Sequence, residues 1–600
     1  MSLSVALHNA MSGLQTNQAI VQVISNNITN ASTEGYTRKS ADPVSVTVAL
    51  EGRGVEASVV SRVVDERVLA DLRRNLSALG AARTEESYHQ RVLDEFGTLA
   101  DNTSLGASIT DLSTAFQTMA TSPESATHRA SVITAAVELT RKLSDLSAQI
   151  QTLRADADKE IANKVTVLNS EIARIADLNE KIAAGQALGA STAELEDFRD
   201  QAMNTVSEMI QIQYFKRTTG EIVVALPDGQ VLADQFAKTI SHTPAGAMSP
   251  DITYAGGQIS GILAGGVDLT TKIPSGEIKG LITARDTILP QLQEEIDLLA
   301  QKLRDELNTL HNAGTGLPPA NTLTGTRTFS DASTNAITTT AAVRIAVVDA
   351  QGNYVKHFDL AAGTYTLAQI ESQIDTNLSG AATASTSANG PLSITATNSA
   401  NGIAIVDLGV QTVTHIDKKS TFSGFSNYFG LNDFFVTQGK VAGSASTGLG
   451  ALIKVRDDLV SNPALLSRGV LDTTTSPTPV AGDPAIAHGD ASTAVAMADK
   501  FLDELSFAAT GALPQITASF AGYAAEILSA SAVAASVAQD TAAFRSTLSE
   551  ELSYRAQEVS GVNIDEELRN LVLYENAFAA TARIIQVVDE LFEQLVNIGR

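Results

Sequence analysis

Histidine and cysteine are the residues from which metal binding or covalent catalysis would first be expected. The chain contains no cysteine, which excludes disulfides, thiolate metal sites and a catalytic thiol. Its histidines are scattered, with no pair at metal-ligand spacing and no His-Glu-x-x-His motif. The eight are His8, His89, His128, His242, His311, His357, His415 and His488. The sequence therefore predicts no metal site and no bound cofactor.

Motifs for phosphate binding and acyl transfer are also missing from the sequence. There is no Gly-x-Ser-x-Gly elbow and no P-loop. Gly52-Arg-Gly54 lacks the third glycine of a dinucleotide-binding loop, and Asp228 and Asp483 stand beside Gly or Pro, as turn residues do. Because no nucleophile, base or metal cluster is visible, we predict that the protein is not an enzyme.

The charge balance limits the kinds of partner. The formal net charge is -26, and the basic residues form no dense patch. Phosphate contacts need clustered Lys and Arg, so neither nucleic acid nor an anionic membrane surface is expected as a partner. The uncharged stretch 506–525 contains Gly511 and Pro514 and is predicted to be packed helix and loop, not a membrane span.

The first residues lack the positive and apolar regions of a Sec-type signal peptide. If the protein works outside the cell, we therefore expect that it is exported without a cleaved signal peptide.

The strongest pattern at the N-terminus is helical. Residues 1–30 are predicted to form one helix, in which apolar residues recur at alternating spacings of four and three, with Asn17 as the polar exception. These N-terminal seam residues are Leu3, Leu7, Ala10, Leu14, Val21, Ile24 and Ile28. Such spacing is typical of a coiled coil, so this helix requires a partner helix.

The same alternation returns at the C-terminus, with Thr581 as the exception. Asn563 is the predicted N-cap, and the carboxylates of Asp565, Glu566 and Glu567 complement the positive end of the helix dipole. The C-terminal seam residues are Leu571, Tyr574, Phe578, Ile585, Val588, Phe592 and Leu595. We predict that both terminal helices are assembly elements. We further hypothesise that they are partly disordered in the free subunit and become ordered when subunits stack.

Long helices and a short β segment are predicted between the ends. Helical periodicity predicts helix at residues 55–100, 125–184, 194–210 and 277–311, and mainly helix at 491–556. The second of these carries two apolar seams offset by one residue, which is a coiled-coil stutter. Residues 210–240 are predicted to be strands with a turn at Pro227-Asp228-Gly229.

A β-rich domain is predicted after Gly314, where the chain becomes rich in Thr, Ser, Ala, Asn and Gly. Residues 343–348 and 354–358 predict a hairpin around Gly352-Asn353, and residues 367–378 predict a short helix. The alternative interpretation of this composition is a disordered Thr/Ser linker.

These elements predict a mainly α fold with inserted β-rich domains: terminal coiled-coil helices, a long helical bundle domain and an outer β or α+β insert. The predicted domains are a terminal coiled-coil core (1–45 and 550–600), a helical rod-like domain with a small β segment near 210–275 (46–313 and 440–549), and a β-rich outer insert (314–439).

The residues after the first helix carry a family resemblance. The segment Ile24-Ser-Asn-Asn-Ile-Thr-Asn-Ala-Ser-Thr-Glu-Gly-Tyr-Thr-Arg38 resembles the signature shared by bacterial flagellar rod, hook and hook-associated proteins. The motif residues are Asn26, Asn27, Asn30, Gly35, Tyr36 and Arg38. Their types predict a polar helix exit and a turn at Gly35, with Tyr36 contacting the next domain.

Further stretches narrow the resemblance. Gly54-Val55 followed by Arg62, Asp65 and Leu69 resembles the family's next block. The stretch Ser560-Gly-Val-Asn-Ile-Asp-Glu-Glu567 resembles the C-terminal signature, in the form found in hook–filament junction proteins. Two interior stretches are similar to junction-protein elements, Leu195-Glu-Asp-Phe-Arg-Asp-Gln201 and Tyr428-Phe-Gly-Leu-Asn-Asp433.

This resemblance implies a structural subunit that joins the flagellar hook to the filament. It implies a ring of copies of the chain itself, with the hook protein and the second hook-associated junction protein as neighbours. It also implies an export chaperone that binds the C-terminal helix, and a place outside the cell at the hook–filament junction.

Other functions stay open on the sequence alone. A hook or rod subunit is the nearest alternative, and a flagellin fits the terminal motifs less well. An adhesive surface protein with a carbohydrate-binding insert is less favoured, because Tyr354, Phe358 and Tyr365 are predicted core residues and leave no aromatic platform for sugars.

Overall fold

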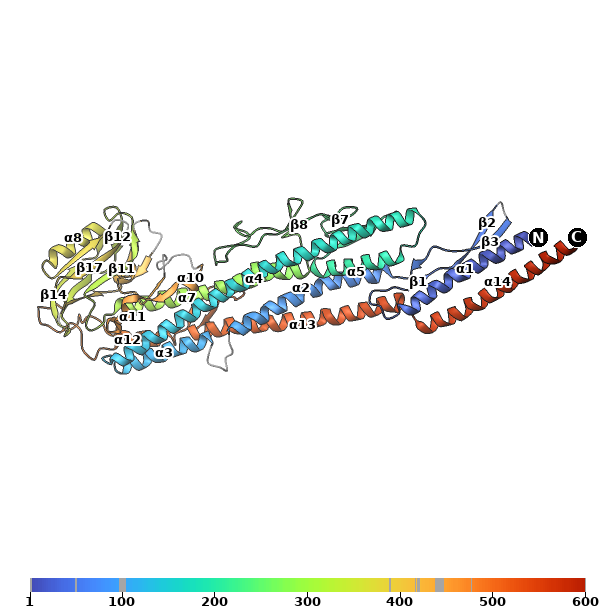
Figure 1. The fold of residues 1–600 in the computed structure, drawn as a ribbon. Coiled ribbons are helices and arrows are strands. Elements are labelled where there is room, and N and C mark those ends of the chain that lie inside the picture. Colours follow the sequence, from blue (N-terminus) through green and yellow to red (C-terminus); the bar gives the residue numbers. More distant parts are fainter. Residues whose placement is uncertain are drawn as a thin grey trace.

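The two ends of the chain meet in space. In the computed structural model, helix α1 (Leu3–Thr29) lies beside helix α14 (Ile564–Ile598) at one end of an elongated molecule, and a β-rich unit lies at the other end (Figure 1). The structure describes residues 3–48, 51–96, 104–387, 390–415, 417, 421–437, 447–475 and 477–598. The predicted fold class is confirmed, since long helices connect these two ends.

Helix α4 (Ala126–Ala187) is the longest element and confirms the predicted helix at 125–184. Ser125 caps its N-terminus by accepting a hydrogen bond from the backbone N–H of His128 at 3.3 Å. The predicted seam residues of this helix are all buried: Leu139, Leu143, Leu146, Ile150, Leu153, Ala157, Ile161, Val165, Leu168, Ile172, Ile175 and Ile182. This continuous apolar face packs against α3 (Leu105–Thr121), α5 (Ala193–Met209) and α7 (Leu289–Ala313).

Helix α2 (Glu66–Phe96) packs along α13 (Phe520–Ser560), so the chain runs out from the terminal helices and back along one bundle (Figure 1). The prediction that helix begins at residue 55 is wrong. Residues 51–57 form strand β3, which pairs with β2 (Pro43–Val48), and the Asp65 carboxylate caps the helix that follows. The predicted end of that helix at residue 100 lies outside the described residues.

The helix predicted at 277–311 contains a π-helical turn. It is divided into α6 (Glu277–Thr283), a π segment (Ala284–Ile288) and α7. Arg285 lies in the π segment, is fully buried, and pairs with Asp158 of α4 at 2.5 Å. The wider turn therefore directs a buried cation toward the longest helix.

The small β segment is confirmed at the predicted place. Strands β5 (Gln213–Lys216), β6 (Ile222–Ala225) and β7 (Val231–Ala233) form an antiparallel sheet, and Gly229 has a φ of 90° in the predicted turn. A second small sheet consists of β8 (Ile240–Ser241), β9 (Leu263–Ala264) and β10 (Val267–Asp268).

The prediction of mainly helix over 491–556 needs one correction. Between α12 (Ser492–Lys500) and α13, strands β23 (Leu505–Phe507) and β24 (Ile516–Ala518) form a hairpin. Gly511, with a φ of 61°, and Pro514 interrupt the helical pattern there, which explains why the hairpin forms.

The β-rich unit contains three antiparallel sheets around helix α8 (Leu367–Asn377) and its own hydrophobic core. Residues 343–348 and 354–360 form the predicted hairpin, with Val343 opposite Leu360, and Gly352 has a φ of 88° in its turn. The sheets are β11-β17-β16 (Thr322–Phe329, Gly390–Ala396, Ala382–Thr386), β15-β12-β19-β20 (Gly363–Thr366, Ala336–Thr339, Thr412–His415, Thr421–Ser423) and β14-β13-β18 (Tyr354–Leu360, Val343–Val348, Gly402–Asp407). The described part of this region is therefore folded, and the linker alternative is wrong for it.

Short elements complete the chain. They are β1 (Lys39–Ser40), β4 (Ser61–Arg62), α9 (Phe425–Phe429), β21 (Phe435–Thr437), α10 (Leu449–Leu452), β22 (Ile453–Val455), α11 (Asp457–Ser461) and a 3-10 turn (Pro463–Leu465). The predicted domain boundary between residues 439 and 440 lies outside the described residues.

Candidate functional site

The motif that follows α1 forms a compact turn. The backbone N–H of Asn30 donates to Asn26 O at 3.0 Å, and the N–H of Tyr36 donates to Thr33 O at 3.2 Å. Gly35 has a φ of 77°, in agreement with the predicted turn, and faces the side chain of Gln201 on α5. The turn therefore brings the end of α1 against the helical bundle.

Asn27 makes the largest number of contacts in this turn. Its side chain is 1 % exposed. Its amide nitrogen donates to Lys39 O at 2.8 Å and to a Glu567 carboxylate oxygen at 3.2 Å. Its amide oxygen accepts from Lys39 N at 3.0 Å and from the Tyr36 hydroxyl at 2.9 Å. A buried amide with these partners is fully satisfied, so replacing it leaves several polar groups unpaired.

Arg38 connects the N-terminal motif to the C-terminal motif. Its guanidinium donates to Glu567 at 2.7 Å and to Glu566 at 3.0 Å, and its backbone N–H donates to Ser560 O at 2.7 Å. Asn563 caps α14 as predicted, by accepting from the N–H groups of the first turn at 3.1 and 3.2 Å. The two motifs singled out in the sequence are therefore in direct contact.

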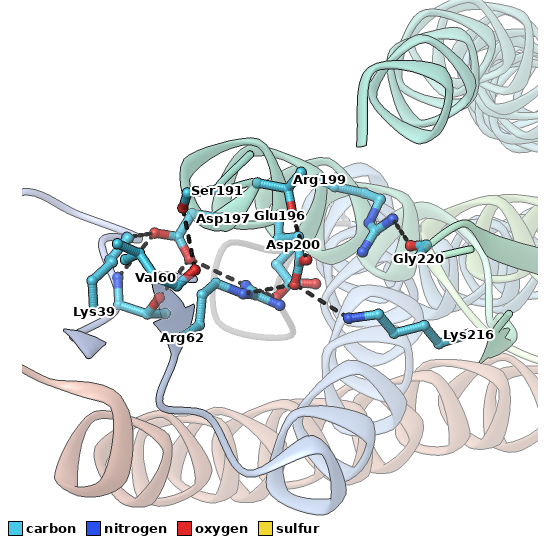
Figure 2. A network of polar contacts seen from close by, with 12 residues as sticks. Lys39, Val60, Arg62, Ser191, Glu196, Asp197, Arg199, Asp200, Lys216 and Gly220 are labelled. Carbon is cyan, nitrogen blue, oxygen red and sulfur yellow. Dashed lines mark hydrogen bonds and ion pairs between the residues drawn. The ribbon is translucent and has the colours of Figure 1, made fainter. Parts of the chain in front are cut away.

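Carboxylates of α5 hold the same segment against the bundle (Figure 2). Asp197 pairs with Lys39 and accepts from the Thr37 hydroxyl at 2.6 Å. Arg62, on β4, donates to Asp197 at 3.1 Å and to Asp200 at 2.6 Å. These charges are buried, so each depends on its partners to offset the loss of hydration.

The same cluster extends to α2 and β5. Arg73 donates to Asp200 at 2.8 Å, and Lys216 pairs with Glu196 at 3.3 Å. Burial alone would raise the pKa of the Asp200 carboxyl, but Arg73 and Arg62 outweigh burial and hold it below its ordinary value. Asp200 is therefore ionised over the physiological range.

We call this cluster the junction network. Its members are Asn27, Tyr36, Thr37, Arg38, Lys39, Arg62, Arg73, Glu196, Asp197, Asp200, Lys216, Glu566 and Glu567. It joins α1 and α14 to each other and both of them to α2 and α5. These contacts hold the connected elements in fixed positions, because every charged side chain in the network has a partner of opposite charge.

Tyr36 was expected to contact the next domain, and its hydroxyl donates a hydrogen bond to Asn27 of α1, the helix that precedes the turn. The Lys39 ammonium lies 3.6 Å from the centre of the Tyr36 ring, in a cation–π contact. Burial, and then the Asp197 carboxylate, raise the pKa of Tyr36 to about 12. The phenol therefore keeps the proton that it donates to Asn27. Asn26 and Asn30 lie at the helix exit and contribute local backbone contacts.

Among the predicted N-terminal seam residues, Ile24 and Ile28 belong to a hydrophobic cluster that includes Leu571 and Tyr574 of α14. Ala10 and Ile24 are buried, and the others are half-buried: Leu3, Leu7, Leu14, Val21 and Ile28. Two buried positions lie outside that seam. Gly13 faces Thr581 of α14, and Thr16 donates to Val55 O at 3.0 Å because strand β3 covers a second flank of α1.

The predicted C-terminal seam residues differ in exposure, and Leu571 and Tyr574 pack against a cluster that contains Ile20 and Ile24 of α1. Val588 is buried, and Leu571, Tyr574, Ile585 and Phe592 are half-buried. Phe578 and Leu595 remain 38 % and 59 % exposed. The pairing of α1 with α14 thus leaves apolar surface uncovered, and whether that surface assembles subunits stays a prediction.

Among the described residues, no group of three or more His, Asp and Glu side chains could hold a metal ion. By length and hydropathy alone, one window within the stretch Phe520–Asn597 is apolar enough to cross a membrane, and 28 % of that window is buried in the structure. The stretch comprises α13 and most of α14 and is divided at Gly561.

Several members of the junction network were not predicted from sequence. Lys39, Arg73, Asp197 and Asp200 were given no role, although two of them belong to the stretch 195–201 that resembles a junction-protein element. The one available signal was the run of acidic residues in the first turns of α5, which resembles an ordinary solvated helix start.

Known proteins match the chain over the segments that build this site. The family described as "Flagellar hook-associated protein FlgK helical domain" matches residues 93–329. The families "Flagella basal body rod protein" and "Flagellar basal body rod FlgEFG protein C-terminal" match residues 7–37 and 555–598. Flagellar hook-associated protein 1 of Escherichia coli (strain K12) is 24 % identical over 618 residues, which covers 99 % of this chain and 100 % of that protein. The chain resembles flagellar hook-associated protein 1 along nearly its whole length.

Two further relatives carry the same name. The protein of that name from Salmonella typhimurium is 24 % identical over 612 residues, covering 99 % of this chain and all of the relative. The Bacillus subtilis protein is 21 % identical over 348 residues, covering 52 % of this chain and 68 % of the relative. A solved flagellar hook junction protein from Burkholderia pseudomallei covers 82 % of this chain and 100 % of its own, with a TM-score of 0.47 and 16 % identity.

The similarity to flagellar hook-associated and rod proteins identifies the chain as a structural component of the bacterial flagellum, assembled within its axial structure. The rod-protein match at residues 7–37 includes Asn27, Tyr36 and Thr37 of the junction network, and the match at 555–598 includes Glu566 and Glu567. The network members on α5 and β5 lie within the match to the FlgK helical domain.

Proposed function

We propose that this protein is the structural subunit that joins the flagellar hook to the filament, and that it is not an enzyme. The observation that supports this most strongly is the pairing of α1 with α14 and their attachment to the bundle through the junction network. A subunit that transmits load between two lattices needs its terminal assembly helices fixed to its body. The paired buried charges provide such a fixed attachment.

The proposed neighbours are other copies of the chain in a ring, the hook protein, and the second hook-associated junction protein. In this arrangement the terminal helices lie innermost, the bundle next, and the β-rich unit outermost. The exposed apolar residues of α14 support contacts between copies, because an isolated chain gains nothing by leaving them in water. We also propose that a dedicated chaperone covers α14 before export, and that export occurs without a cleaved signal peptide to the outside of the cell.

Deletion of the gene, followed by electron microscopy of the cells, tests the function. We expect hooks without filaments, and unpolymerised flagellin in the medium. Normal filaments on the deletion strain would contradict the proposal.

A hook or rod subunit is the second candidate, because both terminal segments match rod-protein families. The same deletion distinguishes the two functions. Loss of a hook or rod subunit removes the hook itself, whereas loss of a junction subunit leaves hooks in place.

The terminal helices are further proposed to be ordered fully only in the assembly. Hydrogen exchange on the soluble protein tests this point. Weak protection of residues 3–28 and 565–598 relative to α4 is expected, and strong protection of both segments would contradict it.

A further inference from the structure

A groove lies beside α1, between that helix and the start of α5. It has a volume of about 720 Å³. Ala19, Val23, Leu195 and Phe198 contribute apolar groups to its lining, and Phe198 is 47 % exposed, although its ring is large and apolar. A concave apolar surface of this kind is typical of a docking site for an apolar side-chain stripe.

The chain's own α14 is on the wrong side of α1 to fill the groove. Gly13 of α1 faces Thr581 of α14. Gln22, which lines the groove, follows Gly13 by nine residues and so lies about half a turn around the helix. Any helix in this groove must therefore come from another molecule.

Helix α14 carries an apolar stripe that the described part of the chain leaves largely exposed. The stripe contains Leu573, Ile584, Val587, Leu591 and Leu595, which are 61, 49, 53, 45 and 59 % exposed. Their spacing, with Ala577 and Ala580 between the first two, continues at intervals of three and four, as a second helix–helix seam requires. This stripe lies about a quarter of a turn away from Thr581, which faces α1.

Charge at the two surfaces is complementary. Glu194 is an exposed carboxylate at the rim of the groove. Arg583 is exposed beside the stripe, and it is the one basic residue of the sequence between Arg569 and Arg600. The groove's other charged lining residue, Lys39, is already paired with Asp197.

We infer that the α14 stripe of one copy docks in the α1–α5 groove of a neighbouring copy, with Arg583 next to Glu194. The inference rests on the proposed function, since it names the contact between copies in the ring. Groove and stripe are different surfaces, so the contact is heterologous and closes into a ring or continues as a helix. That is the geometry that a subunit of an axial structure needs.

Cysteine cross-linking of the full-length protein tests the contact, and the absence of native cysteine makes the result specific. Purified Ala19→Cys protein is mixed at high concentration with Val587→Cys protein under oxidising conditions. We expect a disulfide-linked pair in several-fold higher yield than with Gln586→Cys, whose side chain is exposed on the polar side of the same turn. Equal yields at 586 and 587, or no cross-linked pair, would overturn the inference.

Charge exchange tests the same contact in cells. Glu194→Arg alone and Arg583→Glu alone are expected to reduce the fraction of hooks that carry filaments, and the double variant is expected to restore it. Filaments on all three strains, or a double variant no better than the singles, would refute the pairing. Neither outcome tests the proposed function, which is tested separately by the gene deletion.

Discussion

The side-chain amide of Asn27 donates a hydrogen bond to the carboxylate of Glu567 at 3.2 Å, across 540 positions of sequence. Through this bond the last turn of α1 is attached to the first turn of α14. Arg38 binds the same carboxylate from the other side. The terminal helices are thus held at their inner ends by matched polar groups, while their outer parts pair through apolar side chains.

Replacing Asn27 with Ala is expected to release the inner ends of both terminal helices. The change leaves the buried N–H and C=O of Lys39 without partners, which costs about 1–3 kcal/mol. Hydrogen exchange of α1 and α14 in the purified protein measures the effect as faster exchange in both helices. Asn26→Ala, at an exposed position one residue away, is the matched control and should leave exchange unchanged.

Asp200→Asn should weaken the attachment of the terminal helices to the bundle in a pH-dependent way. Arg73 and Arg62 lower the pKa of Asp200 in the folded protein. The contribution of the ionised carboxylate to stability is therefore present above the pKa of the unfolded state and is lost as the pH falls through the pKa of the folded state. The variant should therefore have a lower thermal midpoint than the wild type at pH 7, and the gap should narrow toward pH 3.

The control for that prediction is Asp177→Asn, which removes an exposed pair with Lys181 on α4. Such a pair contributes little, so the midpoint should hardly move. If the difference in thermal midpoint between the wild type and Asp200→Asn is the same at pH 7 and at pH 3, the proposed role of the Asp200 charge is contradicted.

Glu295 makes stability depend on pH in the opposite direction to Asp200. This carboxyl of α7 is 3 % exposed and accepts a hydrogen bond from Ala512 N in the β23–β24 hairpin at 2.8 Å. Burial raises its pKa to about 7, with the neighbouring Glu294 adding to the shift. A raised acid pKa means that its contribution is complete below the unfolded pKa and is lost as pH rises through 7.

Glu295→Gln should therefore stabilise the protein at pH 8 relative to the wild type and flatten its stability between pH 5 and pH 8. Denaturant unfolding at both pH values measures this. Glu294→Gln, at the exposed neighbouring position, should not flatten the profile. A wild-type profile that is already flat would refute the assignment.

Leu168→Ala should strongly destabilise the bundle, because Leu168 is fully buried in the second seam of α4. A cavity of that size costs about 2–5 kcal/mol. Val167→Ala, at a position 47 % exposed, is the control and should cost much less. Equal unfolding midpoints for the two variants would contradict the buried seam.

The helices and the resemblance to flagellar proteins could be predicted from the sequence, because both depend on residues that lie close together along the chain. Alternating apolar spacing predicted α1, α4 and α14, and Asn563 was correctly predicted as an N-cap. Gly35 was correctly placed in a turn, since few other residues adopt its backbone angles.

The junction network could not be predicted, because it depends on tertiary contacts between charged residues that have no local pattern. In the sequence, Asp197 and Asp200 resemble the solvent-exposed first turn of an ordinary helix. In the fold, they form ion pairs with Lys39, Arg62 and Arg73. The burial of Thr16 on α1 also depends on a tertiary contact. Strand β3 covers a flank of the helix that the heptad pattern predicts to be exposed to solvent.

The central claim is that pairing of the terminal helices builds the chain into the flagellar axis. Its most direct test is electron microscopy of a deletion strain that produces the Val588→Asp chain, with Gln586→Asp as control. Val588 is 5 % exposed in the seam between α1 and α14, so an aspartate there opposes the pairing. We predict bare hooks with Val588→Asp and filaments with Gln586→Asp, and normal filaments on the Val588→Asp strain would contradict the account.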